Sequence, residues 1–178
     1  MMSGEQTIVF LQQYEKHQQQ PKLLTNNKRR RRNVSADIWT DASFDENIFV
    51  CASAIHFECK QRRQKINLTF YHKDIRNSNE AEAVGIIQAL RMGMNRNIQA
   101  LRIFTDSKSC CNTFNNICLF KRKCPRFLSE KVFNEINQLI SRFRIVTFHW
   151  CARSSHPNNV LVDRMARFTF QNLKRRNK

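Results

Sequence analysis

The stretch QALRIFTDSKSCC, residues 99–111, places an acidic residue between an apolar run and a run of small polar residues. Its first seven residues predict a short buried strand, and residues 106–120 predict a helix that follows at once. Asp106 stands at the junction, where an acidic residue commonly caps a helix by accepting bonds from free backbone N–H groups. A metal ligand is the second interpretation, because sites in open sheets form beyond the carboxyl ends of parallel strands.

Around this stretch, the apolar periodicity predicts a regular alternation of strands and helices. Strands are expected at 36–43, 47–57, 64–73, 99–105 and 144–152, and helices at 79–94, 106–120, 128–143 and 160–176. Ser78 or Asn79 is predicted to cap the first helix. The order β-β-β-α-β-α-α-β-α predicts an α/β fold with a mixed five-stranded sheet and helices on both faces. In this sheet an antiparallel meander is joined to parallel strands by helical crossovers.

The N-terminal residues differ from the rest, since they are Gln-rich and then strongly basic. We expect a flexible arm over 1–35, a folded domain over 36–174 and a basic tail over 175–178. The block Lys28–Arg32 predicts a nuclear localisation signal or a phosphate-binding patch, with a solvated charge run as the alternative.

The composition narrows the classes of function. Thirty-one Lys and Arg against fourteen Asp and Glu give a net charge of +17, which points to a polyanion such as nucleic acid. No apolar run approaches the roughly 18 residues that cross a membrane, and no signal-peptide pattern is seen, so no membrane partner is expected. The seven cysteines form no CxxC pair. We therefore expect neither a disulfide framework nor a zinc site, and an intracellular protein.

Four carboxylates stand out by their positions in this order of elements. They are Asp41 in the first strand, Glu82 early in the first helix, Asp106 after the fourth strand and Asp163 early in the last helix. If the first and fourth strands are neighbours, the four converge at one edge of the sheet. Convergent carboxylates repel one another and persist only where a cation compensates them. Oxygen ligands without His or Cys favour Mg²⁺ or Mn²⁺, and two such ions suit phosphodiester hydrolysis.

Each acid also has a purely structural interpretation. Asp41 could face solvent in the middle of its strand, although Asp is disfavoured there. Glu82 competes with Glu80 as a first-turn acid that serves the helix dipole. Asp163 could form a surface pair with Arg167 one helical turn away.

From about residue 36 to 173 the chain resembles the ribonuclease H family, type I branch. The motifs that carry the resemblance are IWTDAS (38–43), NEAEAVGIIQAL (79–90), IFTDSKS (103–109) and HPNNVLVDRMAR (156–167). The resemblance implies a ribonuclease H-like fold and a four-carboxylate catalytic site for two Mg²⁺ ions, with Mn²⁺ as a substitute. Its ligands would be Asp41, Glu82, Asp106 and Asp163, because AVGIIQAL follows Glu82 rather than Glu80 in the family's register. The implied activity is cleavage of the RNA strand of RNA–DNA hybrids by a monomer.

Two positions depart from the family's pattern. Ala42 replaces the glycine of a TDGS-like motif. Many members carry a His in the loop before the last helix, and here Arg153, Ser154 or Ser155 stands near that position. His156 matches a different slot and is expected to be a loop residue.

Contacts to a substrate are expected from basic and amide side chains. The basic loop at 121–127 is the candidate for gripping the DNA strand, and a solvated loop is the alternative. The strand residues Trp39 and Trp150 are expected in the core rather than as base-stacking platforms. The predicted substrate-binding set is Asn79, Lys108, Lys121, Arg122, Lys123, Arg153 and Asn159.

Three functions agree with these observations. The first is an active ribonuclease that cleaves RNA–DNA hybrids. The second is a non-catalytic nucleic-acid-binding module on the same fold, from a mobile-element polyprotein or a relic of one. The third is another nuclease of the same superfamily that acts on DNA, which would normally show a different order of acids.

Overall fold

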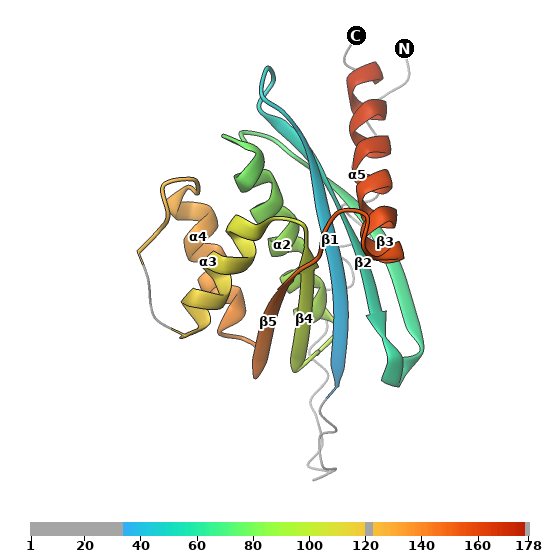
Figure 1. Ribbon diagram of the computed structural model, residues 1–178, viewed down its shortest axis with the longest axis vertical. Coiled ribbons are helices and arrows are strands. Elements are labelled where there is room, and N and C mark those ends of the chain that lie inside the picture. The colour runs from blue at the N-terminus through green and yellow to red at the C-terminus, as the bar shows by residue number, and fades with distance from the viewer. Residues whose placement is uncertain (1–33, 120–122, 177–178) are drawn as a thin grey trace, which may run out of the picture. The chain divides into compact units, whose positions relative to one another are not determined.

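The computed structural model describes residues 34–119 and 123–176 of the 178-residue chain. Its elements follow the predicted order, and their ends shift by a few residues (Figure 1). The strands are β1 (Ser35–Asp45), β2 (Val50–Cys59), β3 (Gln64–His72), β4 (Ala100–Thr105) and β5 (Ile145–Trp150). The helices are the short 3₁₀ helix η1 (Lys60–Arg62) and the α-helices α2 (Ser78–Asn95), α3 (Lys108–Leu119), α4 (Glu130–Ile140) and α5 (Pro157–Arg176).

The sheet has five strands in the order β3-β2-β1-β4-β5. The first three strands form an antiparallel meander, and β4 and β5 run parallel to β1. Parallel strands need crossover connections. Helix α2 carries the chain from β3 across to β4, which pairs with β1, and α3 with α4 connects β4 to β5. The predicted mixed α/β sheet is therefore confirmed.

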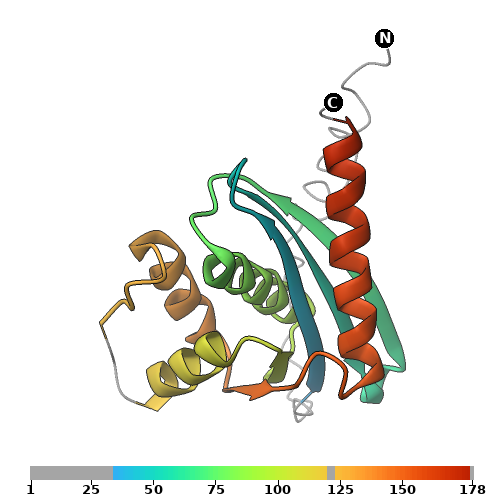
Figure 2. The same cartoon turned by 45° about the horizontal axis from the view of Figure 1, so that its top comes forward.

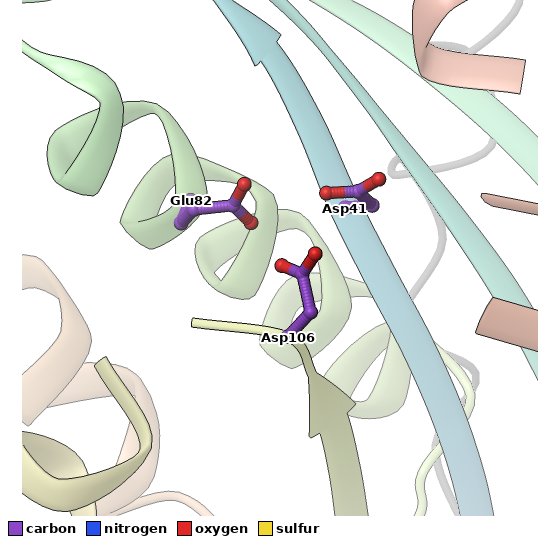
Figure 3. A group of neighbouring side chains, drawn as sticks. All are labelled: Asp41, Glu82 and Asp106. Carbon is purple, nitrogen blue, oxygen red and sulfur yellow. The ribbon is translucent and has the colours of Figure 1, made fainter. Parts of the chain in front are cut away.

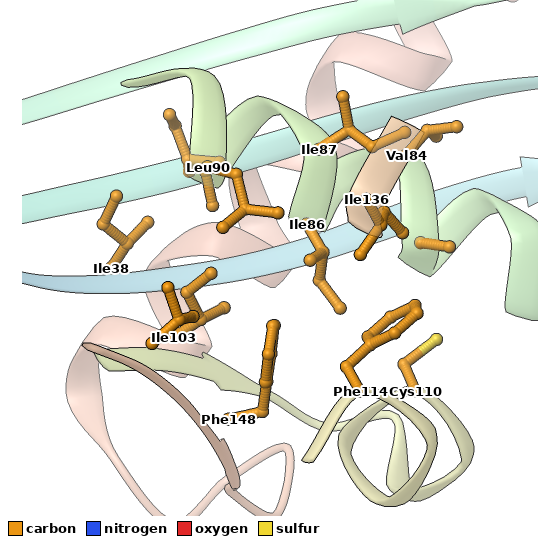
Figure 4. Close-up of a cluster of buried hydrophobic side chains, with 14 of the residues drawn as sticks. Ile38, Val84, Ile86, Ile87, Leu90, Ile103, Cys110, Phe114, Ile136 and Phe148 are labelled. Atoms are coloured by element: carbon orange, nitrogen blue, oxygen red, sulfur yellow. The ribbon is translucent and has the colours of Figure 1, made fainter. Parts of the chain in front are cut away.

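Helices cover both faces of the sheet, with α2, α3 and α4 on one side and α5 on the other (Figures 1 and 2). The main core lies on the three-helix side, where side chains from the strands and from all three helices interlock (Figure 4). It includes Ile38, Ile103 and Phe148 from the sheet, Ile86 and Leu90 from α2, Phe114 from α3 and Ile136 from α4. A smaller cluster under α5 joins Trp39 and Ala54 to Val162 and Ala166.

The first helix is capped by a residue one position earlier than predicted. Asn77, not Ser78 or Asn79, accepts a bond from the backbone N–H of Glu80 at 2.9 Å. Its amide group also donates to the carbonyl of Phe127 at 3.0 Å. This second bond ties the start of α2 to the loop before α4, which a cap at Ser78 or Asn79 would not do.

The two tryptophans lie in different environments, so the prediction for one of them is wrong. Trp39 is buried and stacks between Phe104 and His156. Trp150 is 47% exposed, because it ends β5, which is the edge strand of the sheet. The two tryptophans differ in exposure because only Trp150 lies at the edge of the sheet, and local sequence does not encode that position.

Most cysteines of the described residues are small core residues. Cys51, Cys59, Cys110 and Cys111 are buried, and no cysteine of the described residues forms a disulfide. Among the helices of residues 34–119 and 123–176, none has both the length and the apolarity that crossing a bilayer takes.

Candidate metal centre

The register between β1 and β4 brings Asp41 and Asp106 to the same level of the sheet. Trp39 is paired with Phe104 in these parallel strands, so the residues two positions further along each chain lie side by side. Because β4 ends at Thr105, β1 loses its neighbour there and its edge is open beside Asp41. Asp106 is the first residue past the end of β4.

Glu82 reaches this edge from α2, which lies on the face of the sheet that α3 and α4 also cover (Figures 1 and 2). A close approach of the helix to β1 makes this possible, and Gly85 lies at the contact. A Cβ atom at Gly85 would stand only 2.7 Å from the hydroxyl oxygen of Thr40, the neighbour of Asp41. Any side chain at position 85 would therefore push α2 away from the strand that carries Asp41. Sequence reasoning missed Gly85, although a helix-interior glycine usually signals a packing constraint.

The three carboxylates converge on one point (Figure 3). One oxygen from each of Asp41, Glu82 and Asp106 lies within 4.8 Å of the others. Glu80, the competing candidate, turns elsewhere and is buried, accepting bonds from the backbone N–H groups of Arg76 and Ser129. The structure thus places Glu82, and not Glu80, with the two aspartates.

Crowding of negative charge perturbs these groups. Burial and then the charge of Asp106 raise the pKa of the Asp41 carboxyl to about 7, against the opposing charge of Arg153. Burial, followed by the charges of Asp41 and Asp106, raises the pKa of Glu82 well above its ordinary range. The nearby charge of Arg153 does not offset burial and mutual repulsion, and a bound cation would add the missing positive charge.

The donor set fits a divalent cation. All three side chains offer oxygen, the ligand that Mg²⁺ and Mn²⁺ prefer. The Oε2 atom of Glu82 is buried and has no hydrogen-bond partner, which is costly for a carboxylate. Asp106 is not the cap of α3, because Ser107 accepts the bond from the Cys110 N–H at 3.3 Å. The Asp106 carboxylate is therefore not used by the helix and can face the other acids.

Asp163 lies outside this trio and is held by two arginines. Arg167, one turn along α5, donates to its Oδ1 atom at 3.0 Å. Arg153, in the loop between β5 and α5, stands with its Nε atom 3.3 Å from the same oxygen and 3.2 Å from Oδ2 of Asp106. The Arg153 guanidinium therefore lies between Asp163 and the other acids.

The family model described as reverse transcriptase-like matches residues 59–169, which is more than half of the chain. The chain belongs to the reverse transcriptase-like family. The match includes Glu82, Asp106 and Asp163, and it begins after Asp41. No curated protein sequence matches the chain.

Solved structures agree with this membership. The N-terminal RNase H domain of a Mycobacterium tuberculosis protein, studied as a fusion with maltose binding protein, superposes with a TM-score of 0.67 at 18% identity. That likeness covers 82% of this chain and 99% of the other. RNase H1 from the halophilic archaeon Halobacterium salinarum superposes with a TM-score of 0.62 at 12% identity, covering 78% and 98%. The ribonuclease H-like fold and the predicted family resemblance are confirmed.

The ribonuclease H-like domain tolerates the two departures from the family's motifs. Ala42 needs no positive φ, and its backbone N–H donates to Oδ1 of Asp41 at 2.9 Å. Of the three residues near the family's loop His, Arg153 is the one that faces the acids. His156 packs its ring on Trp39, with the ring centroids 5.2 Å apart.

The predicted substrate contacts fall in several places on the domain. Lys108 is exposed at the start of α3, with its ammonium 4.3 Å from the ring centroid of Trp150. Trp150 also donates its indole N–H to the carbonyl of Asp106 at 3.0 Å. The side chains of Lys108 and Trp150 therefore both border the centre. Asn79 is half-buried near the start of α2, and Lys123 is exposed. Lys121 and Arg122 lie outside the described residues, as does the Lys28–Arg32 block.

Asn159 is buried and supports the loop that carries Arg153. Its amide nitrogen donates to the carbonyls of Cys151 and Ala152, each at 3.2 Å. These bonds fix the chain where it turns from β5 into α5. In this structure the amide is turned toward the loop rather than toward a substrate.

Proposed function

We propose that this protein is an endonuclease that hydrolyses the RNA strand of RNA–DNA hybrids by two-metal-ion catalysis. The observation that carries the proposal is the convergence of Asp41, Glu82 and Asp106 around a buried carboxylate oxygen without a partner. The reverse transcriptase-like family and the ribonuclease H-like fold support a nuclease. An RNA–DNA hybrid is an intracellular substrate, in agreement with the intracellular location expected from the cysteine pattern.

The acids have separate roles in the proposed mechanism. Asp41, Glu82 and Asp106 would hold Mg²⁺ or Mn²⁺, and Asp163 would complete the site from α5. The metal ions would supply activation of the attacking water and stabilisation of the leaving oxygen. Gly85 and the β1–β4 register keep the three converging carboxylates in place, and Asn159 positions the loop beside them.

Recognition of the substrate is proposed to depend on charge and shape. A net charge of +17 attracts the phosphate backbone whatever its sequence. Lys108 borders the carboxylates and Lys123 is exposed, and together with Lys121 and Arg122 we propose that they bind the phosphates. Selection of a hybrid over DNA would rest on groove shape and 2′-OH groups.

The test is incubation of the full chain with end-labelled hybrid, double-stranded RNA and double-stranded DNA, in Mg²⁺, Mn²⁺ or EDTA. We expect cleavage of the hybrid's RNA strand alone, dependent on a divalent cation. Asp106→Asn should lower the rate at least about 100-fold, because metal ions contribute several kcal/mol to such reactions. Glu135→Gln is the matched control, since this acid on α4 pairs with Arg91 away from the centre. Cleavage that survives in Asp106→Asn would refute the assignment.

The alternative is a non-catalytic nucleic-acid-binding module on the same fold. The position of Arg153 among the acids favours it, because the guanidinium already compensates part of their charge. Hybrid binding without cleavage in either metal would establish this alternative and exclude the nuclease.

A further inference from the structure

Arg153 makes ion pairs with three of the four acids. Its Nε atom lies 3.2 Å from Asp106 and 3.3 Å from Asp163, and its Nη2 atom lies 4.0 Å from Asp41. Its side chain is nevertheless 54% exposed. The guanidinium is thus held at the surface by ion pairs and a hydrogen bond to the acids, so it can leave when its partners bind another cation.

A divalent cation at the centre competes with this guanidinium. The oxygens that Arg153 contacts belong to the groups that would coordinate the ion, and like charges at this range repel. Asp163 is also kept out of the trio while Arg153 stands between them. Loading the centre with metal therefore requires Arg153 to move away.

Arg153 already lines a groove beside the centre, into which its guanidinium can turn away from the acids. This groove has a volume of about 380 Å³ and lies between the end of β1 and α5. It is lined by the two arginines Arg153 and Arg167, by their partner Asp163, and by Ala42, Ser43, Phe44, Phe170 and Gln171. Once metal neutralises Asp163, both arginines face this space without their acidic partner. Two guanidinium groups and two polar side chains suit a phosphate group, which accepts charge-assisted bonds from a planar fork of donors.

We propose that Arg153 is an exchangeable counter-ion that neutralises the carboxylates until metal displaces it, and then binds a backbone phosphate of the substrate beside Arg167 in the adjoining groove. The proposal rests on the proposed function for its substrate. Asn159 and Ser155 fasten the backbone of the loop, so the exchange involves the side chain of Arg153 rather than its backbone. An arginine guanidinium is not deprotonated in proteins, so the group carries its charge in both positions.

The first experiment compares Arg153→Gln with the wild type in thermal melting and in calorimetric titration with Mg²⁺ and Mn²⁺, without nucleic acid. In EDTA we expect Arg153→Gln to melt lower, because the acids lose their counter-ion. We expect its metal affinity to rise at least about fivefold, because a repelling charge is gone. Arg153→Lys keeps the charge and should restore the wild-type values. Arg164→Gln, an exposed arginine on α5, should change neither quantity.

These two effects have opposite signs, which separates the proposal from a merely structural role. An arginine that only supports the loop would lower the melting temperature and weaken metal binding together. Metal affinity that is unchanged or lower in Arg153→Gln would overturn the proposal. If neither the wild type nor the variant bound metal, the proposed function itself would fail, so the two failures are distinguishable.

The second experiment tests the phosphate position by measuring binding to a hybrid whose RNA strand carries 2′-O-methyl groups. We expect Arg153→Gln to weaken binding in Mg²⁺ by several-fold and to leave binding in EDTA nearly unchanged. Arg167→Gln should weaken binding in Mg²⁺ in the same way. Equal losses in Mg²⁺ and EDTA would overturn the exchange, because Arg153 would then contact nucleic acid with or without metal.

Discussion

Single side chains at the centre divide their tasks more finely than the sequence indicates. Ser107 caps α3, which leaves the carboxylate of the preceding Asp106 for the metal site and for Arg153. Glu80 and Glu82 are two positions apart on one helix, yet Glu80 joins α2 to α4 while Glu82 faces Asp41. A helix turns about 100° per residue, so two acids at this spacing point in different directions and cannot share one partner. The structural interpretation therefore applies to Glu80, and the proposed metal-ligand role applies to Glu82.

His72 is a half-buried titratable group away from the centre, and it makes stability depend on pH. Burial and then the charge of Arg91 lower its pKa from 6.5 to about 4. An unfolded chain takes up this proton near pH 6.5, but the folded chain resists it until about pH 4. The contribution to stability is therefore intact above pH 6.5 and is lost as the pH falls through this window. The loss amounts to about 3 kcal/mol at most, at 1.36 kcal/mol per pKa unit.

Urea denaturation at pH 7 and pH 4.5 measures this effect. His72→Gln cannot take up a proton, so the variant should lose less stability than the wild type between the two values. The difference between the two proteins isolates His72 from carboxylates that titrate in the same range. Parallel losses in both proteins would show that His72 is not responsible.

At the scale of elements, the distance between α2 and β1 decides whether the acids meet. Gly85 and Thr40 are the contact, and the Thr40 hydroxyl is buried without a hydrogen-bond partner. The helix must lie this close because Glu82 projects from it toward Asp41 on the strand. The proposed metal centre thus depends on a packing contact that lies one helical turn from Glu82.

Gly85→Ala should disturb both stability and metal binding. Overpacking costs about 1–3 kcal/mol, which the better helix propensity of Ala offsets by up to about 1 kcal/mol. Because α2 must shift, we expect Mg²⁺ affinity to fall as well. Thr40→Ala removes the clashing oxygen, so the double variant Gly85→Ala/Thr40→Ala should regain metal binding. Chemical denaturation and calorimetry of the four proteins form a double-mutant cycle, and simple additivity would contradict the proposed contact.

At the scale of the whole molecule, the basic charge is divided between the domain and the residues before it. Seven of the 31 Lys and Arg lie in residues 1–32, five of them in the Lys28–Arg32 block. The domain begins earlier than residue 36, because the Val34 carbonyl accepts bonds from the Gln99 and Ala100 N–H groups at 3.0 and 3.3 Å. An N-terminal truncation that spares the sheet must therefore stop before this residue.

Deletion of residues 1–32 should weaken hybrid binding and flatten its salt dependence. For B-DNA, the plot of log K against log [salt] has a negative slope. The magnitude of this slope decreases by about 0.9 for each phosphate that the protein no longer neutralises. Binding at several salt concentrations measures this, and an unchanged slope would show that these residues do not bind phosphate. The melting temperature of the truncated protein serves as the control and should stay close to that of the full chain.

Local sequence determined the order of strands and helices, the mixed sheet and three acids of the centre. Alternation, helical periodicity and short motifs encode local conformation, and chain order with parallel pairing then places Asp41, Glu82 and Asp106 at one edge. The exposure of Trp150, the contact at Gly85 and the capture of Asp163 by Arg153 were decided only by the tertiary structure. Each of these depends on distances of a few Å between segments far apart in the chain. Such distances follow from packing and from the balance of charges in the folded molecule, which no local pattern records.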